Sequence, residues 1–168
     1  MPDAEELARQ LAARLIERRL TLALAESCTA GLVADLLARV SGISAALWGS
    51  FVCYSPDAKQ RMLGIEPDFL ERHGLVSAET AREMALRARE RAGASIAAAV
   101  TGIAGPGGDG SGVPVGTVWV AVARQGHCRE KELHFEGTRA AIRMQAAAAV
   151  LEELLEVVNE PLDCTRGA

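Results

Sequence analysis

Residues 20–37 read LTLALAESCTAGLVADLL, an apolar run that passes through a short polar turn into a helical pattern. The run from Leu20 to Ala25 predicts a buried strand, and the leucines and valine after Gly31 predict a helix. A strand that runs directly into a helix places the turn at a sheet edge, where the first amide N–H groups of the helix have no partner within the helix. These groups can receive an anion or an oxyanion, so chemistry is first expected at this turn.

Helices and strands alternate along the rest of the chain. Helices are expected over 3–18, from an N-cap at Ser27 or Thr29 to about Val40 before Gly42, from Pro56, from Pro67, from Ser77 to about Ala92, and from Thr138 onward. Strands are expected over 20–25, 47–54 and 95–100, followed by a hairpin of 116–124 with 128–135. The alternation predicts an α/β fold, a three-layer α/β/α sandwich, and the hairpin makes its central sheet mixed.

Length and composition narrow the class of protein. The 168 residues suit one domain over 1–160 with a tail at 161–168. A formal charge of −4 and only six aromatic residues argue against a nucleic-acid partner. No apolar run approaches the roughly 18 residues of a membrane span, and the acidic start is unlike a signal peptide, so we expect a soluble, cytoplasmic protein. The four cysteines form no C-x-x-C pair, and neither a metal site nor a disulfide framework is expected.

A serine and a lysine stand out as a nucleophile and its base. Lysine supplies only Lys59 and Lys131 of the 18 basic residues, and a lysine can lose its proton where an arginine cannot. Lys59 falls in the first turn of a predicted helix, where the macrodipole disfavours its charged form. Ser27 with Lys59 and Tyr54, the only tyrosine, would form a serine nucleophile with an amine or phenolate base. The alternative for Lys59 is a solvated surface lysine.

Two further segments are expected near this group because the carboxyl ends of strands meet at one crevice of an α/β sheet. The segment from Thr101 to Gly112 holds six glycines, including Gly102 and Gly105, and can bring its backbone close to a phosphate. Arg139 starts the last helix and can hold a phosphate there, with Arg143 one turn later. The alternatives are a flexible surface loop and a solvated helix face.

Cys28 is a competing nucleophile, because a thiol at a helix N-terminus can be held as thiolate. No histidine lies near it in the sequence, which favours a buried structural cysteine over a thiol enzyme. Thr29 fits a helix cap better than a nucleophile.

Several spaced motifs together resemble the CinA C-terminal domain family, a domain also found alone as the bacterial nicotinamide-nucleotide amidase PncC. The resemblance covers nearly the whole chain. Its motifs are Ala25-Glu26-Ser27-Cys28-Thr29, Phe51-Val52-Cys53-Tyr54-Ser55 with Lys59, Leu63-Gly64, His73-Gly74-Leu75-Val76-Ser77, Thr101-Gly102-Ile103-Ala104-Gly105-Pro106 and Pro114-Val115-Gly116-Thr117-Val118.

The resemblance implies an α/β/α domain that hydrolyses the carboxamide of nicotinamide mononucleotide to nicotinic acid mononucleotide and ammonia. Ser27 would attack the amide carbon, and Lys59 and Tyr54 would assist proton transfer. The predicted substrate-binding residues are Thr29, Thr101, Gly102, Gly105 and Arg139. No cofactor and no metal are implied, the partner is a small-molecule nucleotide, and a homodimer is expected. The alternative is a non-catalytic module that binds a nucleotide or a partner protein.

Two positions depart from the family pattern. Ala30 stands where the motif normally has a glycine, and Val113 precedes Pro114 where a lysine is common. An alanine is tolerable at position 30 if the backbone there is helical. The larger members of the family also carry an N-terminal domain, for which we expect no room in this chain.

Overall fold

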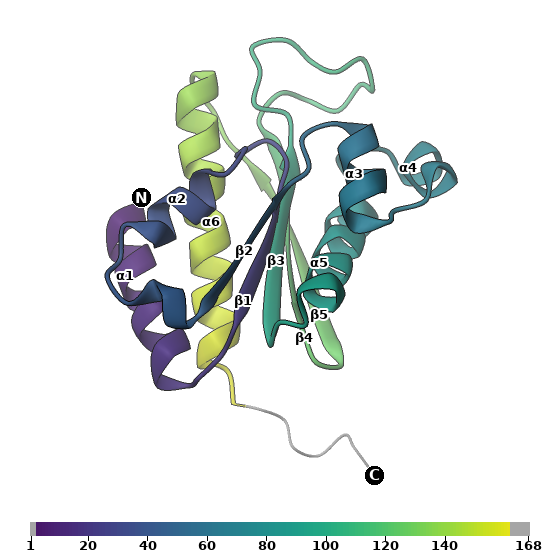
Figure 1. Cartoon of the computed structure of the whole chain (residues 1–168). Helices are drawn as coiled ribbons and strands as arrows, with labels where there is room; N and C mark the ends of the chain where they lie inside the picture. The colour runs from purple at the N-terminus through teal and green to yellow at the C-terminus, as the bar shows by residue number, and fades with distance from the viewer. Residues whose placement is uncertain (1–2, 162–168) are drawn as a thin grey trace.

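A computed structural model of the chain describes residues 3–161, in which one sheet carries helices on both faces (Figure 1). The strands are β1 (Leu22–Glu26), β2 (Leu47–Val52), β3 (Ile96–Gly102), β4 (Thr117–Arg124) and β5 (His127–His134). The helices are α1 (Ala4–Glu17), α2 (Leu32–Ala38), α3 (Pro56–Leu63), α4 (Pro67–His73), α5 (Ala78–Ala92), α6 (Arg139–Asn159) and the short 3-10 helix η1 (Ile43–Ala45).

The strand order is β2-β1-β3-β4-β5. β1 pairs in parallel with β2 and β3, whereas β4 pairs antiparallel with β3 and β5. The predicted α/β class and mixed sheet are therefore confirmed. Figure 1 shows α1, α2 and α6 on one side of the sheet and α3, α4 and α5 on the other. The carboxyl ends of β1, β2 and β3 all point to the same edge of the sheet, because these three strands are parallel.

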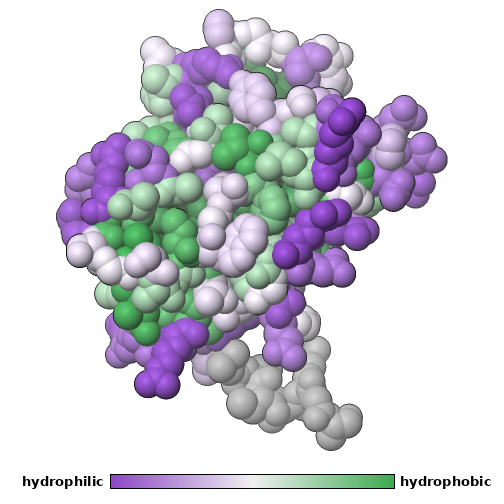
Figure 2. All heavy atoms as spheres, viewed as in Figure 1, coloured by the Kyte–Doolittle hydropathy of each residue, from purple (hydrophilic) through white to green (hydrophobic). Residues whose placement is uncertain are grey.

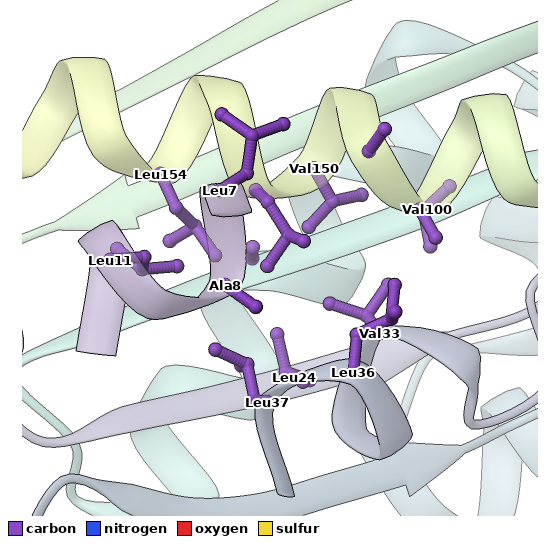
Figure 3. Packing of buried hydrophobic residues seen from close by; sticks show 14 of the residues in the cluster. Leu7, Ala8, Leu11, Leu24, Val33, Leu36, Leu37, Val100, Val150 and Leu154 are labelled. Carbon is purple, nitrogen blue, oxygen red and sulfur yellow. The ribbon is translucent and has the colours of Figure 1, made fainter. Parts of the chain in front are cut away.

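Alternate residues of the central strands pack into two hydrophobic cores, one on each face of the sheet. Large side chains such as Leu22, Leu24 and Val100 face α1, α2 and α6, and Figure 3 shows how Leu24 and Val100 meet leucines and valines from these helices. The opposite side presents alanines, Ala23 and Ala25 among them, to α5. Small side chains let α5 lie close to the sheet, and the fully buried residues on both faces hold β1 in place under the turn that follows it.

Most helices begin where the sequence predicts. Ser55, Ser77 and Thr138 are the N-caps of α3, α5 and α6, and each side chain accepts a backbone N–H of the first turn. α2 differs, because it starts at Leu32 after Gly31 rather than from a cap at Ser27 or Thr29. It also ends at Ala38 rather than at about Val40.

The remaining boundaries shift slightly. β2 ends at Val52, so Tyr54 lies in the connection to α3 rather than in the strand. Gly42 precedes the turn η1 instead of closing α2. Of the predicted tail at 161–168, all but Pro161 lies outside the described residues.

β2 is an edge strand, and its outer side is partly apolar. Trp48 is 51% exposed and stacks on Phe51. In Figure 2, hydrophobic and weakly polar residues gather over the middle of this face, with hydrophilic residues along its margins. None of the helices between residues 3 and 161 combines the length and the hydropathy that crossing a membrane requires.

Candidate active site

Ser27 and Lys59 meet at the end of β1. Ser27 is the first residue after the strand, and its backbone N–H donates to the carbonyl of Val100 in β3. Lys59 comes from the first turn of α3, which Ser55 and Pro56 set in place. The Lys59 Nζ lies 2.9 Å from the Ser27 Oγ and donates to the carbonyl of Cys53 at 3.0 Å. Two of the three predicted catalytic side chains, Ser27 and Lys59, are thus in direct contact.

The surroundings of Lys59 favour its neutral form. Only 2% of the residue is exposed, and both of its hydrogen-bond partners are uncharged. Among residues 3–161, no carboxylate pairs with it. Burial therefore lowers the pKa of the Lys59 amine from its ordinary value. A neutral amine carries a lone pair that can accept the Ser27 proton, which is what a general base requires. The alternative of a solvated surface lysine is wrong.

A cavity of about 210 Å³ opens beside this pair. It is lined by the three strand ends that the sequence singled out, represented by Ser27, Tyr54 and Thr101. The lining also includes Lys59, Leu75, Val76, Gly102, Gly105, Asp109 and Arg139. The fold thus brings together segments from three parts of the chain at one sheet edge, as expected for ligand sites of α/β proteins.

Thr101 and the glycines behind it form one wall of the cavity. The Thr101 hydroxyl donates to the carbonyl of Leu75 at 2.7 Å, so its oxygen keeps lone pairs that can accept from a ligand. Gly102 has no room for a side chain, because a Cβ there would lie 2.8 Å from the carbonyl oxygen of Thr117. Gly105 has a φ of +75°, which glycine adopts without strain.

Tyr54 and Arg139 join across the rim of the cavity. One Arg139 Nη donates to the Tyr54 hydroxyl at 2.5 Å, and the other donates to the carbonyl of Gly105 at 2.7 Å. Tyr54 is 54% exposed and contacts Arg139 rather than Ser27. The structure therefore places both Tyr54 and Arg139 at the cavity. Tyr54 lies at its exposed edge, whereas Lys59 lies in its buried part.

The N-terminus of α2 is already occupied by a carboxylate of the chain. Glu26 is 1% exposed, and its two oxygens accept the backbone N–H groups of Gly31, Val33 and Ala34. The expectation that these amides await an anion is therefore wrong. The amides of Cys28 and Thr29, which precede the helix, are not among the donors to Glu26.

The prediction that Thr29 binds substrate is not supported by its position. Thr29 is fully buried, its hydroxyl donates to Glu26 at 2.7 Å, and its side chain does not line the cavity. The carboxylate beside it, rather than the threonine itself, caps the helix. Cys28 does line the cavity, but burial raises the pKa of its thiol to about 11. At neutral pH it is a thiol, which argues against a Cys28 nucleophile.

Three residues near the site were not assigned these roles from the sequence. Glu26 precedes the serine directly, and a lone carboxylate at a strand-to-helix junction is the signal that could have indicated it. Asp109 lines the cavity from the glycine-rich loop. Arg143 does not line the cavity and instead donates to the carbonyls of Cys28 and Thr29.

Comparison with known proteins identifies the family of the chain. The sequence profile of the CinA C-terminal domain family matches residues 4–158. A CinA-like protein of Geobacter sp. (strain M21) is 50% identical over 141 residues, 84% of this chain and 34% of the relative. A putative competence-damage inducible protein of Levilactobacillus brevis is 42% identical over 94% of this chain and 38% of its own length. The chain thus spans about a third of the curated relatives it matches.

Solved structures share the fold over at least nine-tenths of their length. A competence/damage inducible protein, CihA, from Agrobacterium tumefaciens superposes with a TM-score of 0.89 and 41% identity, covering 95% of this chain and 98% of that one. A CinA superfamily protein from Escherichia coli has a TM-score of 0.89 and 36% identity, covering 92% and 90%. On the profile, the relatives and the fold together, this chain belongs to the CinA C-terminal domain family.

Proposed function

We propose that the chain is an amidase that hydrolyses the carboxamide of nicotinamide mononucleotide to nicotinic acid mononucleotide and ammonia. The observation that carries the proposal is the buried contact between the Ser27 Oγ and the Lys59 Nζ at 2.9 Å. Membership of the CinA C-terminal domain family supports it, because the motifs of the chain resemble those of that domain, which is also found alone as a bacterial nicotinamide-nucleotide amidase. The cytoplasm is the proposed place of the reaction.

In the proposed reaction, Ser27 forms an ester with the substrate. Neutral Lys59 takes the Ser27 proton while the Oγ attacks the amide carbon, which leaves a negative charge on the carbonyl oxygen. The backbone N–H of Cys28, a residue that lines the cavity, is the donor we assign to that oxygen. Collapse of the intermediate breaks the C–N bond, and the Lys59 ammonium returns the proton to the leaving ammonia.

Water then completes the cycle. Lys59, neutral again, takes a proton from a water molecule that attacks the ester carbon, and the bond to the Ser27 Oγ breaks. The proton returns to Ser27, and the carboxylic acid leaves as its anion. Thr101 and Gly102 would line the nicotinamide end of the site, and Arg139 at the start of α6 would meet the phosphate. Tyr54 would assist proton transfer from the rim.

The test is ammonia release from nicotinamide mononucleotide by the purified chain. We expect turnover by the wild type, a loss of at least about 10³-fold in Ser27→Ala, and unchanged turnover in the control Ser44→Ala, because Ser44 is exposed and remote from the cavity. Binding without turnover over a broad pH range would contradict the proposal and favour the non-catalytic nucleotide-binding module.

A homodimer is also part of the proposal. Light scattering on the purified chain tests it, with a mass twice that of one chain as the expected result and a mass of one chain as the contrary result.

A further inference from the structure

Arg143 reaches the turn that carries Ser27 from the side away from Lys59. It projects from the second turn of α6, and its Nε donates to the carbonyl of Cys28 at 3.1 Å. One of its Nη atoms donates to the carbonyl of Thr29 at 2.6 Å. The guanidinium is partly buried and has no ion-pair partner among residues 3–161. Its contacts are therefore two consecutive backbone carbonyls of one turn.

Glu26 holds the same turn through a different set of groups. Its Oε2 accepts the Thr29 hydroxyl at 2.7 Å and the Gly31 N–H at 3.0 Å. Its Oε1 accepts the Ser50 hydroxyl from β2 at 3.0 Å. The turn thus lies between the buried carboxylate of Glu26, which accepts N–H and O–H donors, and the guanidinium of Arg143, which donates to carbonyl oxygens. Neither charged group touches the other, and neither lines the cavity.

Holding a carbonyl also fixes the amide on the other side of the same peptide bond. Because the peptide unit is planar and trans, the Thr29 N–H points away from the Cys28 carbonyl and hence away from Arg143. A hydrogen bond to the carbonyl also polarises the peptide and strengthens its N–H as a donor. The next residue, Ala30, has a φ of +50°, a backbone conformation that an alanine keeps only where its neighbours enforce it.

We propose that Arg143 is a positioning residue for the nucleophile. It holds the 28–29 and 29–30 peptides of the turn so that the Ser27 hydroxyl stays against Lys59. This inference rests on the proposed amidase function and deepens it. The residue acts through the turn and does not touch the substrate.

The kinetic test compares Arg143→Met and Arg143→Lys with Arg124→Met. Arg124 is a matched control, because its guanidinium also donates to a backbone carbonyl, that of Val157, far along α6 from the cavity. We expect Arg143→Met to lower kcat by about 10- to 100-fold with KM changed by less than about threefold, since small displacements of reacting groups reduce rates by such factors. Arg143→Lys should recover part of the loss, and Arg124→Met should keep the wild-type kcat.

A second readout does not depend on turnover. The chain has two lysines, so labelling lysine Cε with carbon-13 gives two signals, and that of Lys59 reports on its contact with Ser27. We expect Arg143→Met, which keeps the two lysines, to move the Lys59 signal and leave that of Lys131, while Arg124→Met moves neither. An unchanged Lys59 signal in folded Arg143→Met, or a higher KM with unchanged kcat, overturns the positioning role. If the wild type releases no ammonia, the amidase proposal fails, and the lysine signal alone decides the role of Arg143.

Discussion

The two lysines of the chain lie in opposite electrical surroundings. Lys59 is enclosed at the carboxyl end of the sheet with a hydroxyl and a carbonyl as partners, and burial lowers the pKa of its amine. Lys131 in β5 is half-exposed and hydrogen-bonds the carboxylate of Glu153 in α6, which raises the pKa of its amine. One residue type thus serves as a proposed base or as a structural cation, according to whether a carboxylate accompanies it.

This difference separates two regions of the molecule. The region around Lys131 joins β5 to α6 through compensated charges, with Arg129 3.6 Å from the same Glu153 carboxylate. The region around Ser27 instead combines an uncompensated buried amine with an alanine at positive φ. A strained backbone and a buried ionisable group without a charged partner often mark functional sites, and here Lys59 lines the cavity while Ala30 lies in the turn that follows Ser27.

Replacing each lysine in turn should give the largest difference in kcat between the two regions. Lys59→Met should lower kcat by about 10²- to 10⁴-fold, the usual contribution of a general base, while Lys131→Met should stay within about twofold of the wild type. Ammonia release from nicotinamide mononucleotide measures both. Circular dichroism checks that the variants are folded, and a folded Lys59→Met with wild-type kcat would remove the basis for the proposed base.

The pH dependence of the reaction should follow Lys59. The base must be neutral, so kcat/KM should fall as pH drops through the lowered pKa of the Lys59 amine. Lys131→Met should leave this profile in place, because its amine lies outside the cavity. A profile measured on the wild type and on Lys131→Met tests this, and a kcat/KM that does not fall with decreasing pH anywhere below 10.5 would speak against Lys59 as base.

The free energy of unfolding should show the reverse order, with a larger loss in Lys131→Met than in Lys59→Met. Lys131→Met should lower the free energy of unfolding by about 1 kcal/mol, because Glu153 then loses its nearest cation, although solvent screens the half-exposed amine. Lys59→Met should lower it little or not at all, since an apolar side chain replaces a buried amine without a charged partner. Urea unfolding measures both, and a larger loss in Lys59→Met would contradict the contrast.

The same experiment has a pH signature. The pKa of Lys131 in the folded protein is raised. The contribution of Lys131 to the free energy of unfolding is therefore complete below the ordinary value of 10.5 and is lost as pH rises through the folded pKa. The folded pKa of Lys59 is lowered, so the wild type should gain stability relative to Lys59→Met as pH rises from the folded pKa toward 10.5.

Ala30→Gly should give the smallest effect. Ala30 is exposed at a φ of +50°, where glycine avoids the steric conflict of the alanine Cβ. The variant should raise the free energy of unfolding by about 0.5–1 kcal/mol. Urea unfolding with ammonia release as a companion measurement checks it. Unchanged kcat would show that the turn is held by Glu26 and Arg143 rather than by the residue at 30, and a large gain in kcat would show the opposite.

The sequence was sufficient for features set by local patterns. The Ser55-Pro56 start of α3 was predicted from neighbouring residues, and it places Lys59 one turn later, facing the end of β1. The mixed sheet followed from a hairpin with its own turn. These features depend on periodicity and capping, which act over a few residues.

The parts that could not be predicted depend on contacts between distant segments. Thr29 is a reasonable cap by residue type, but the Glu26 carboxylate takes the helix amides because Ser50 of the neighbouring strand helps to hold it there. Arg143 was expected on a solvated face or at a phosphate, and it meets Cys28 only because α6 packs against the sheet. Such pairings follow from tertiary packing and have no local signal.

The most direct test of the central claim is a titration of the two lysine amines by NMR. With carbon-13 at lysine Cε, Lys131→Met assigns the two signals, and each is followed as pH rises. The account predicts that the Lys59 amine titrates below 10.5 and the Lys131 amine above it. A Lys59 amine that stays protonated to 10.5 or beyond would contradict its proposed role as the base for Ser27.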